Sequence, residues 1–109
     1  RLGNVEIVRD WGWAPDYVRA IWLMMQRKKP RDFIIGSGKT YSLKDFVNEV
    51  FKNLKINKKN LKTNVSKYRR KIDLRGYKAN IADTQKILKW KPKLKFKTII
   101  HKMINNELF

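Results

Sequence analysis

The chain has 109 residues and a formal net charge of +18, with 27 lysines and arginines against 9 acidic residues. Its 42% hydrophobic and 12% aromatic content is typical of one globular domain and excludes a disordered segment. The absence of cysteine excludes disulfides and thiolate metal sites, and no apolar run approaches the roughly 20 residues that span a bilayer.

The first third of the chain predicts a strand, a turn and a helix. Residues Leu2–Asp10 contain β-branched residues in loose alternation, which favours a strand. The helix is expected over Asp16–Lys28, with Pro15 in its first turn and Pro30 beyond its end. Apolar residues recur at helical spacing along it, namely Val18, Ile21, Trp22 and Met25.

The rest of the chain predicts three more helices and one or two short strands. Phe33–Ile35 is an apolar run that indicates a buried strand, although the chain supplies few strands to pair with it. A capping box over Ser42–Asp45 begins the second helix. A basic surface loop is expected over residues 55–67, with a short strand near Val65. Asn80 and Asp83 could cap a helix that runs to Leu88, and a last helix is expected over Phe96–Leu108.

Two apparent motifs carry little chemistry. Gly36–Thr40 resembles the end of a phosphate-binding loop, but Phe33 stands where that motif needs its first glycine. We therefore expect a strand-to-helix turn there. His101 has no second histidine or carboxylate at ligand spacing, which favours a surface or half-buried histidine.

Arginines at two positions are candidate phosphate ligands. Arg9 begins the run Arg-Asp-Trp-Gly at the end of the first strand, and Arg70 precedes Asp73 by three residues. Guanidinium groups match phosphate oxygens two bonds at a time, and a carboxylate can accept hydrogen bonds from a ribose or a guanine. Taken alone, these residues favour a solvated surface cluster in which Asp73 pairs with Arg69 or Arg70.

These runs together resemble a family. Leu2-Gly3-Asn4, Arg-Asp-Trp-Gly from residue 9, Asp-Tyr-Val from 16, Trp-Leu-Met from 22, Asp-Phe-Ile-Ile from 32 and Leu-x-Trp-Lys-Pro from 88 resemble GDP-mannose 4,6-dehydratases. The resemblance covers nearly the whole chain. It implies an α/β fold, mixed α+β when taken alone: about four helices with short strands, forming the carboxy-terminal substrate-binding part of an extended Rossmann-fold sugar-nucleotide enzyme.

The resemblance also implies a function and a site. The parent enzyme is an NADP-dependent lyase that makes GDP-4-keto-6-deoxymannose in the cytoplasm, and it is expected to be a homo-oligomer. Residues 1–109 form one region, without the NADP-binding Rossmann half, which would be its partner. Arg9 and Arg70 hold the GDP phosphates of the substrate and Asp73 replaces a nucleotide-binding glutamate, while this chain carries no catalytic, cofactor or metal residue. Asp16 is expected to cap its helix.

Three departures from the family pattern and two rival functions remain. Lys71 stands for the usual proline, Asp73 for glutamate and Lys89 for the glycine before the tryptophan. The rivals are a small nucleic-acid-binding module, suggested by nine basic residues and no acid over residues 52–71, and a non-catalytic remnant. Neither a recognition helix nor a membrane segment is visible. Loss of a Rossmann partner should expose an apolar face beside Val18, Trp22 and Phe33–Ile35.

Overall fold

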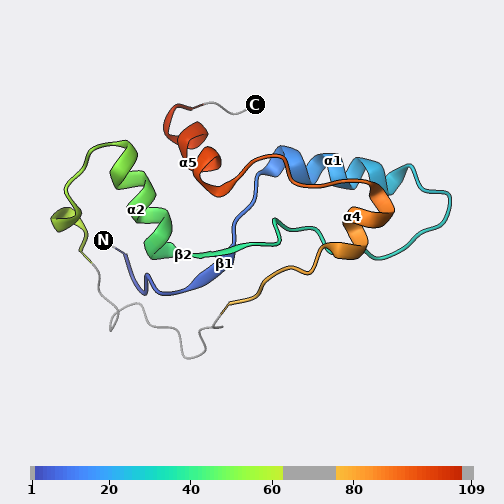
Figure 1. Ribbon diagram of the computed structural model, residues 1–109, viewed down its shortest axis with the longest axis horizontal. Helices are drawn as coiled ribbons and strands as arrows, with labels where there is room; N and C mark the ends of the chain where they lie inside the picture. The colour runs from blue at the N-terminus through green and yellow to red at the C-terminus, as the bar shows by residue number, and fades with distance from the viewer. Residues whose placement is uncertain (1, 63–75, 107–109) are drawn as a thin grey trace.

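The computed structural model describes residues 2–62 and 76–106. Its described residues form a short β ribbon with a pair of helices at either end (Figure 1). Helices α2 (Leu43–Asn53) and α5 (Phe96–Ile104) pack at one end, and α1 (Ala14–Met25) and α4 (Ala82–Leu88) at the other. A 3-10 turn, η1 (Lys58–Asn60), follows α2.

The ribbon consists of β1 (Val8–Asp10) antiparallel to β2 (Thr40–Ser42), with Arg9 opposite Tyr41. The strand predicted from Leu2 is therefore too long. The Asn4 side-chain oxygen accepts a hydrogen bond from the Glu6 backbone N–H at 3.0 Å, which folds the chain into a turn before the strand begins.

The buried strand predicted at Phe33–Ile35 is absent from the described residues. Ile34 is 58% exposed, and its carbonyl oxygen accepts a hydrogen bond from the Thr84 hydroxyl at 2.7 Å rather than from a neighbouring strand. Phe33 and Ile35 pack against a core of Ala20, Leu88 and Trp90. Without a strand beside it, the run cannot form a ladder.

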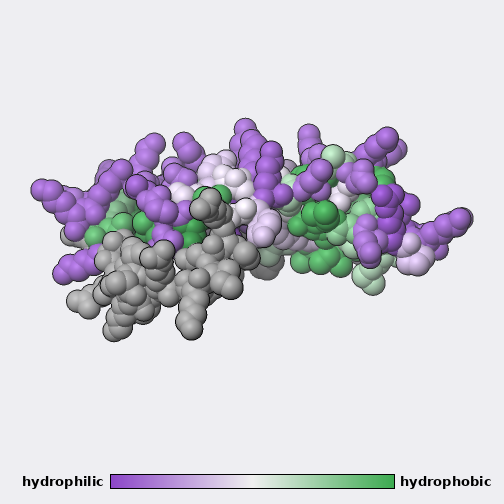
Figure 2. All heavy atoms as spheres, turned by 90° about the horizontal axis from the view of Figure 1, so that it is seen from below, coloured by the Kyte–Doolittle hydropathy of each residue, from purple (hydrophilic) through white to green (hydrophobic). Residues whose placement is uncertain are grey.

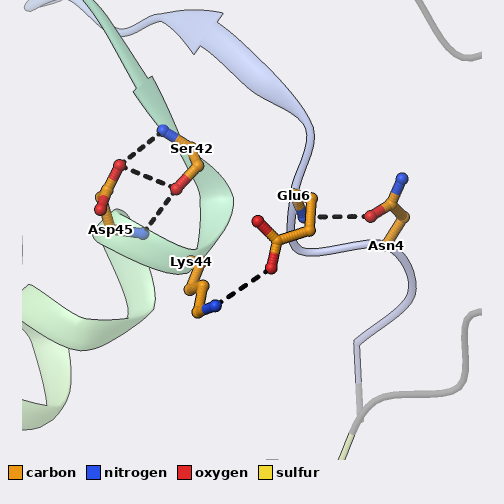
Figure 3. A network of polar contacts seen from close by, with 5 residues as sticks. All are labelled: Asn4, Glu6, Ser42, Lys44 and Asp45. Carbon is orange, nitrogen blue, oxygen red and sulfur yellow. Dashed lines mark hydrogen bonds and ion pairs between the residues drawn. The ribbon is translucent and has the colours of Figure 1, made fainter. Parts of the chain in front are cut away.

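Two predicted helix starts have different outcomes. The capping box is confirmed: the Ser42 hydroxyl accepts from the Asp45 N–H at 3.0 Å, and the Asp45 carboxylate accepts from the Ser42 N–H at 2.9 Å (Figure 3). The Ser42 hydroxyl also donates to the Asp45 carboxylate at 2.7 Å, and this hydrogen bond, followed by the one from the Ser42 N–H, lowers the pKa of Asp45. The cap predicted at Asn80 is one residue too early: the residue before helix α4 is Ile81, and the helix begins at Ala82. The Asn80 side chain still accepts a hydrogen bond from the Ala82 N–H at 3.2 Å.

The prediction that Asp16 caps α1 is wrong. The residue before the helix is Trp13, and Asp16 lies within the first turn with only 5% of its surface exposed. Its carboxylate accepts hydrogen bonds from the backbone N–H groups of Lys93 (2.9 Å) and Leu94 (3.1 Å). The Asp16 carbonyl also accepts from the Trp90 indole at 3.0 Å, so one residue ties α1 to the segment between α4 and α5.

The ends of the remaining helices are close to their predicted positions. Helix α1 stops at Met25, three residues before the predicted end, and α5 is described as helical to Ile104. Leu108 and Val65 lie outside the described residues. His101 is exposed, as predicted. Lys89 ends α4 in the left-handed conformation, with φ of 48°, which explains why glycine suits this position.

The hydrogen bonds that the Asp16 carboxylate accepts should contribute to the stability of the fold. We expect Asp16→Ala to lower the free energy of unfolding by about 2–4 kcal/mol, because two partly buried hydrogen bonds lose their charged acceptor. Asp16→Asn keeps an acceptor oxygen and should cost less. Urea unfolding followed by tryptophan fluorescence measures both. The exposed Asp32→Ala serves as the control, and an Asp16→Ala midpoint equal to that of the control would contradict the assignment.

A second prediction follows from the backbone at Lys89. We expect Lys89→Gly to raise the free energy of unfolding by about 0.5–1 kcal/mol, because glycine adopts the left-handed conformation without strain. The matched control is Lys86→Gly within α4, which should lower stability by about 1 kcal/mol. Thermal unfolding of the two variants should therefore shift in opposite directions. A downward shift for both would refute the strain at Lys89.

Candidate functional site

Arg9 occupies the centre of strand β1 and is half-buried. Its Nη1 donates a hydrogen bond to the Val8 carbonyl at 2.7 Å, and Arg9 makes a further contact. The other two predicted ligands, Arg70 and Asp73, lie outside the described residues. Whether the three side chains share one site therefore stays a prediction.

Gly76 begins the second described stretch and lies against strand β1. A Cβ built on Gly76 would be 2.8 Å from the Val8 Cβ and 3.1 Å from the Val8 carbonyl oxygen. The Gly76 φ angle of +127° also belongs to a region that side chains rarely adopt. Only glycine fits this close approach, which brings residue 76 next to the strand that carries Arg9. This glycine was not among the residues predicted from the sequence to belong to the site.

Asp10, the residue after Arg9, forms hydrogen bonds with the turn over Gly36–Lys39, which we call the glycine turn. The Asp10 carboxylate accepts hydrogen bonds from the N–H groups of Ser37 (2.8 Å) and Gly38 (3.0 Å). The turn that resembled a phosphate-binding loop thus surrounds a carboxylate of its own chain, in the manner of a backbone nest. The turn is confirmed, but it is not the predicted strand-to-helix turn: no strand precedes it at residues 33–35, and it leads into β2 before α2.

Trp11 and Gly12, the next two residues, make contacts that anchor the end of strand β1. The Trp11 indole donates to the Tyr41 carbonyl at 3.0 Å and packs on Phe46, with ring centroids 5.0 Å apart. Gly12 leaves room for the Tyr17 phenol, which a side chain at position 12 would strike. Burial raises the pKa of Tyr17, and the nearby carboxylates of Asp10 and Asp16 raise it further. The Arg-Asp-Trp-Gly run therefore holds Arg9 on a firmly anchored strand.

Helix α1 has apolar residues on two sides. Tyr17, Ala20, Leu23 and Met24 belong to the core cluster. A second stripe, Val18, Ile21, Trp22 and Met25, is 63%, 47%, 58% and 76% exposed. We call it the outer stripe of α1. The exposure of Val18, Trp22 and Ile34 agrees with the predicted apolar face, whereas Phe33 and Ile35, which were expected beside it, pack against the core. Figure 2 shows hydrophobic surface at the end of the molecule that carries α1 and α4. A helix that is apolar all round is normally buried.

Metal-ligand clusters and membrane spans are not found in the part of the chain that the structure describes. Residues 2–62 and 76–106 contain no group of three or more metal-binding side chains, and none of their helices has the length and hydropathy to cross a membrane.

Comparisons with known proteins give the family. The sequence profile of GDP-mannose 4,6 dehydratase matches residues 1–103. GDP-mannose 4,6 dehydratase 1 of Arabidopsis thaliana is 33% identical over 107 residues, which cover 98% of this chain and 30% of that protein. The protein of that family in Dictyostelium discoideum is also 33% identical, again over 98% of this chain but 35% of its own length. The chain thus spans about a third of the relatives' length.

Solved structures share the fold. A dTDP-glucose 4,6-dehydratase from Bacillus anthracis in complex with NAD has a TM-score of 0.82 at 21% identity, over 95% of this chain and 32% of that one. The RMD protein of Pseudomonas aeruginosa with NADPH has a TM-score of 0.78 at 14% identity, over 97% and 34%. The predicted fold class, part of an extended Rossmann-fold sugar-nucleotide enzyme, is confirmed. The sequence comparisons show that the chain belongs to the GDP-mannose 4,6-dehydratase family.

Proposed function

We propose that this chain is the carboxy-terminal, substrate-binding part of a GDP-mannose 4,6-dehydratase, an NADP-dependent lyase that forms GDP-4-keto-6-deoxymannose. Within the cytoplasmic enzyme, which we expect to be a homo-oligomer, the chain binds the GDP-sugar. The NADP-binding half of the enzyme supplies the cofactor site and the catalytic groups. The chain alone is therefore catalytically incomplete.

The contact between Gly76 and Val8 carries this proposal. Gly76 follows Asp73 by three residues and Arg70 by six in the sequence, and it packs directly beside the strand of Arg9. This close approach favours a single site shared by the predicted ligands. Two guanidinium groups are enough to hold a diphosphate, since each charged hydrogen bond contributes about 1.5–3 kcal/mol. Asp73 would accept from the nucleoside.

The chain's chemical task is then binding and alignment. A bound GDP fixes the position of the sugar relative to the nicotinamide, and this positioning lowers the entropic cost of hydride transfer. The anchored ribbon supports the role because Asp10 and Trp11 restrain the strand immediately after Arg9. NADP, when bound to the other half, supplies the hydride chemistry.

The outer stripe of α1 supports the presence of a second half. Its four side chains are exposed and fall at positions i, i+3, i+4 and i+7 of one helix, so they form one contiguous face. A face of this kind is stable when another layer covers it. The NADP-binding half is the occupant that the family architecture provides.

A chimera tests the substrate role. We expect turnover of GDP-mannose when residues 1–109 replace the matching segment of the Arabidopsis relative, and none from the chain alone. In the chimera, Arg70→Ala and Arg9→Lys should each raise KM for GDP-mannose about tenfold or more, through loss of bidentate phosphate contacts. Arg27→Ala, on an exposed residue at the end of α1, is the control. Unchanged KM in both test variants would remove these arginines from the site.

The outer stripe gives another prediction. We expect the 109-residue chain to self-associate, and Trp22→Gln with Met25→Gln to reduce that association by removing exposed apolar surface. Met103→Gln changes a residue that is 57% exposed on α5, away from the stripe, and serves as the control. Light scattering over a concentration series measures the effect. A wild-type chain that stays monomeric with a sharp, high thermal transition would contradict the role of the stripe.

A further inference from the structure

A cavity of about 510 Å³ lies between the glycine turn with strand β2 and the loop that leads into α5. It differs from the proposed GDP-sugar site because Arg9 does not line it. We call it the lysine groove. Its lining residues are Trp11, Ser37, Lys39, Tyr41, Lys91, Pro92, Lys93, Leu94, Lys95 and Phe96.

The charged residues that line the groove in the described part of the chain are all lysines. Lys39 lies on one wall and Lys91, Lys93 and Lys95 lie on the other, and none of the described lining residues is acidic. The carboxylates of the neighbouring segments are turned to other partners. Asp10 accepts from Ser37 and Gly38, and Asp16 accepts from the backbone of the lysine loop itself. Four lysines that line one cavity bring like charges near one another, and an anion bound between them would relieve their repulsion.

The loop that carries three of the lysines alternates in character. Lys91, Lys93 and Lys95 are exposed, whereas Pro92 and Leu94 are half-buried and Phe96 is buried. The loop is anchored at two points: the Asp16 carboxylate holds its middle, and the Phe96 ring stacks on Tyr41 with centroids 4.0 Å apart and planes at 6°. The backbone that carries these lysines is therefore fixed, so binding would order only their side chains, at a lower entropic cost.

We propose that the lysine groove binds a small polyphosphate, a ligand with two or more adjacent phosphoryl groups. Lysine ammonium groups suit phosphate as point charges. The groove has the volume of a small-molecule site, which favours a compact anion over a polymer. A nucleic acid strand also needs open aromatic faces for stacking, but one face of Tyr41 is covered by Phe96, and Trp11 packs on Phe46. This proposal is independent of the proposed enzymatic function.

Calorimetric titration of the 109-residue chain with sodium tripolyphosphate in about 0.15 M NaCl tests the groove, since diffuse surface binding is screened at that salt concentration. The test variant is Lys91→Gln/Lys93→Gln/Lys95→Gln. The control, Lys28→Gln/Lys29→Gln/Lys86→Gln, removes the same charge from exposed lysines that do not line the groove. Lys39→Gln provides a single change on the opposite wall. Circular dichroism verifies the fold of each variant.

We expect one site in the wild-type chain, with affinity reduced about tenfold or more in the test variant. Lys39→Gln should lower the affinity by a smaller factor, and the control should stay within about twofold of wild type. Equal losses in test and control variants would overturn the proposal, because binding would then follow net charge alone. A single-stranded oligonucleotide that requires the groove lysines and is not displaced by tripolyphosphate would overturn it in favour of nucleic acid.

Discussion

The buried carboxylate of Asp16 is the interaction on which the described structure most depends. It accepts hydrogen bonds from the N–H groups of Lys93 and Leu94, which follow Asp16 in the sequence by 77 and 78 positions. Through it, α1 is fixed to the segment that connects α4 with α5, and α5 in turn packs on α2. A buried charge is tolerated only when hydrogen bonds replace its water, and here the same bonds shape one wall of the lysine groove.

A second carboxylate does comparable work at the ribbon. The Asp10 carboxylate accepts hydrogen bonds from the N–H groups of the glycine turn. This turn leads directly into β2, which ends at the capping box of α2. Both acids are adjacent to features with proposed functions: Asp10 to Arg9, and Asp16 to the loop of Lys91–Lys95. The fold thus uses these two acidic residues to organise its backbone, while the lysines of the groove are exposed, where anionic ligands can reach them.

What the sequence predicted well was local. The capping box of Ser42 and Asp45, the helical spacing in α1 and the exposed outer stripe follow from residues within a few positions of one another. The wrong predictions concern residues whose structure depends on partners far away in the sequence. Asp16 looked like a helix cap because Lys93 and Leu94 cannot be recognised as its partners from sequence spacing. Phe33–Ile35 looked like a strand because its composition is that of one, yet strand formation needs a neighbour. Of the candidate site, Arg9 lies on the predicted strand, but the positions of Arg70 and Asp73 remain predictions.

The central claim is that Arg9 and Arg70 bind the same diphosphate. A double-mutant cycle on GDP affinity, measured by calorimetry in the chimera with Arg9→Ala, Arg70→Ala and the double variant, tests it most directly. If the two side chains bind one diphosphate, their effects are coupled and the double variant loses less affinity than the sum of the single losses, by about 0.5 kcal/mol or more. Losses that add within experimental error, or a single variant without effect, would contradict a shared site.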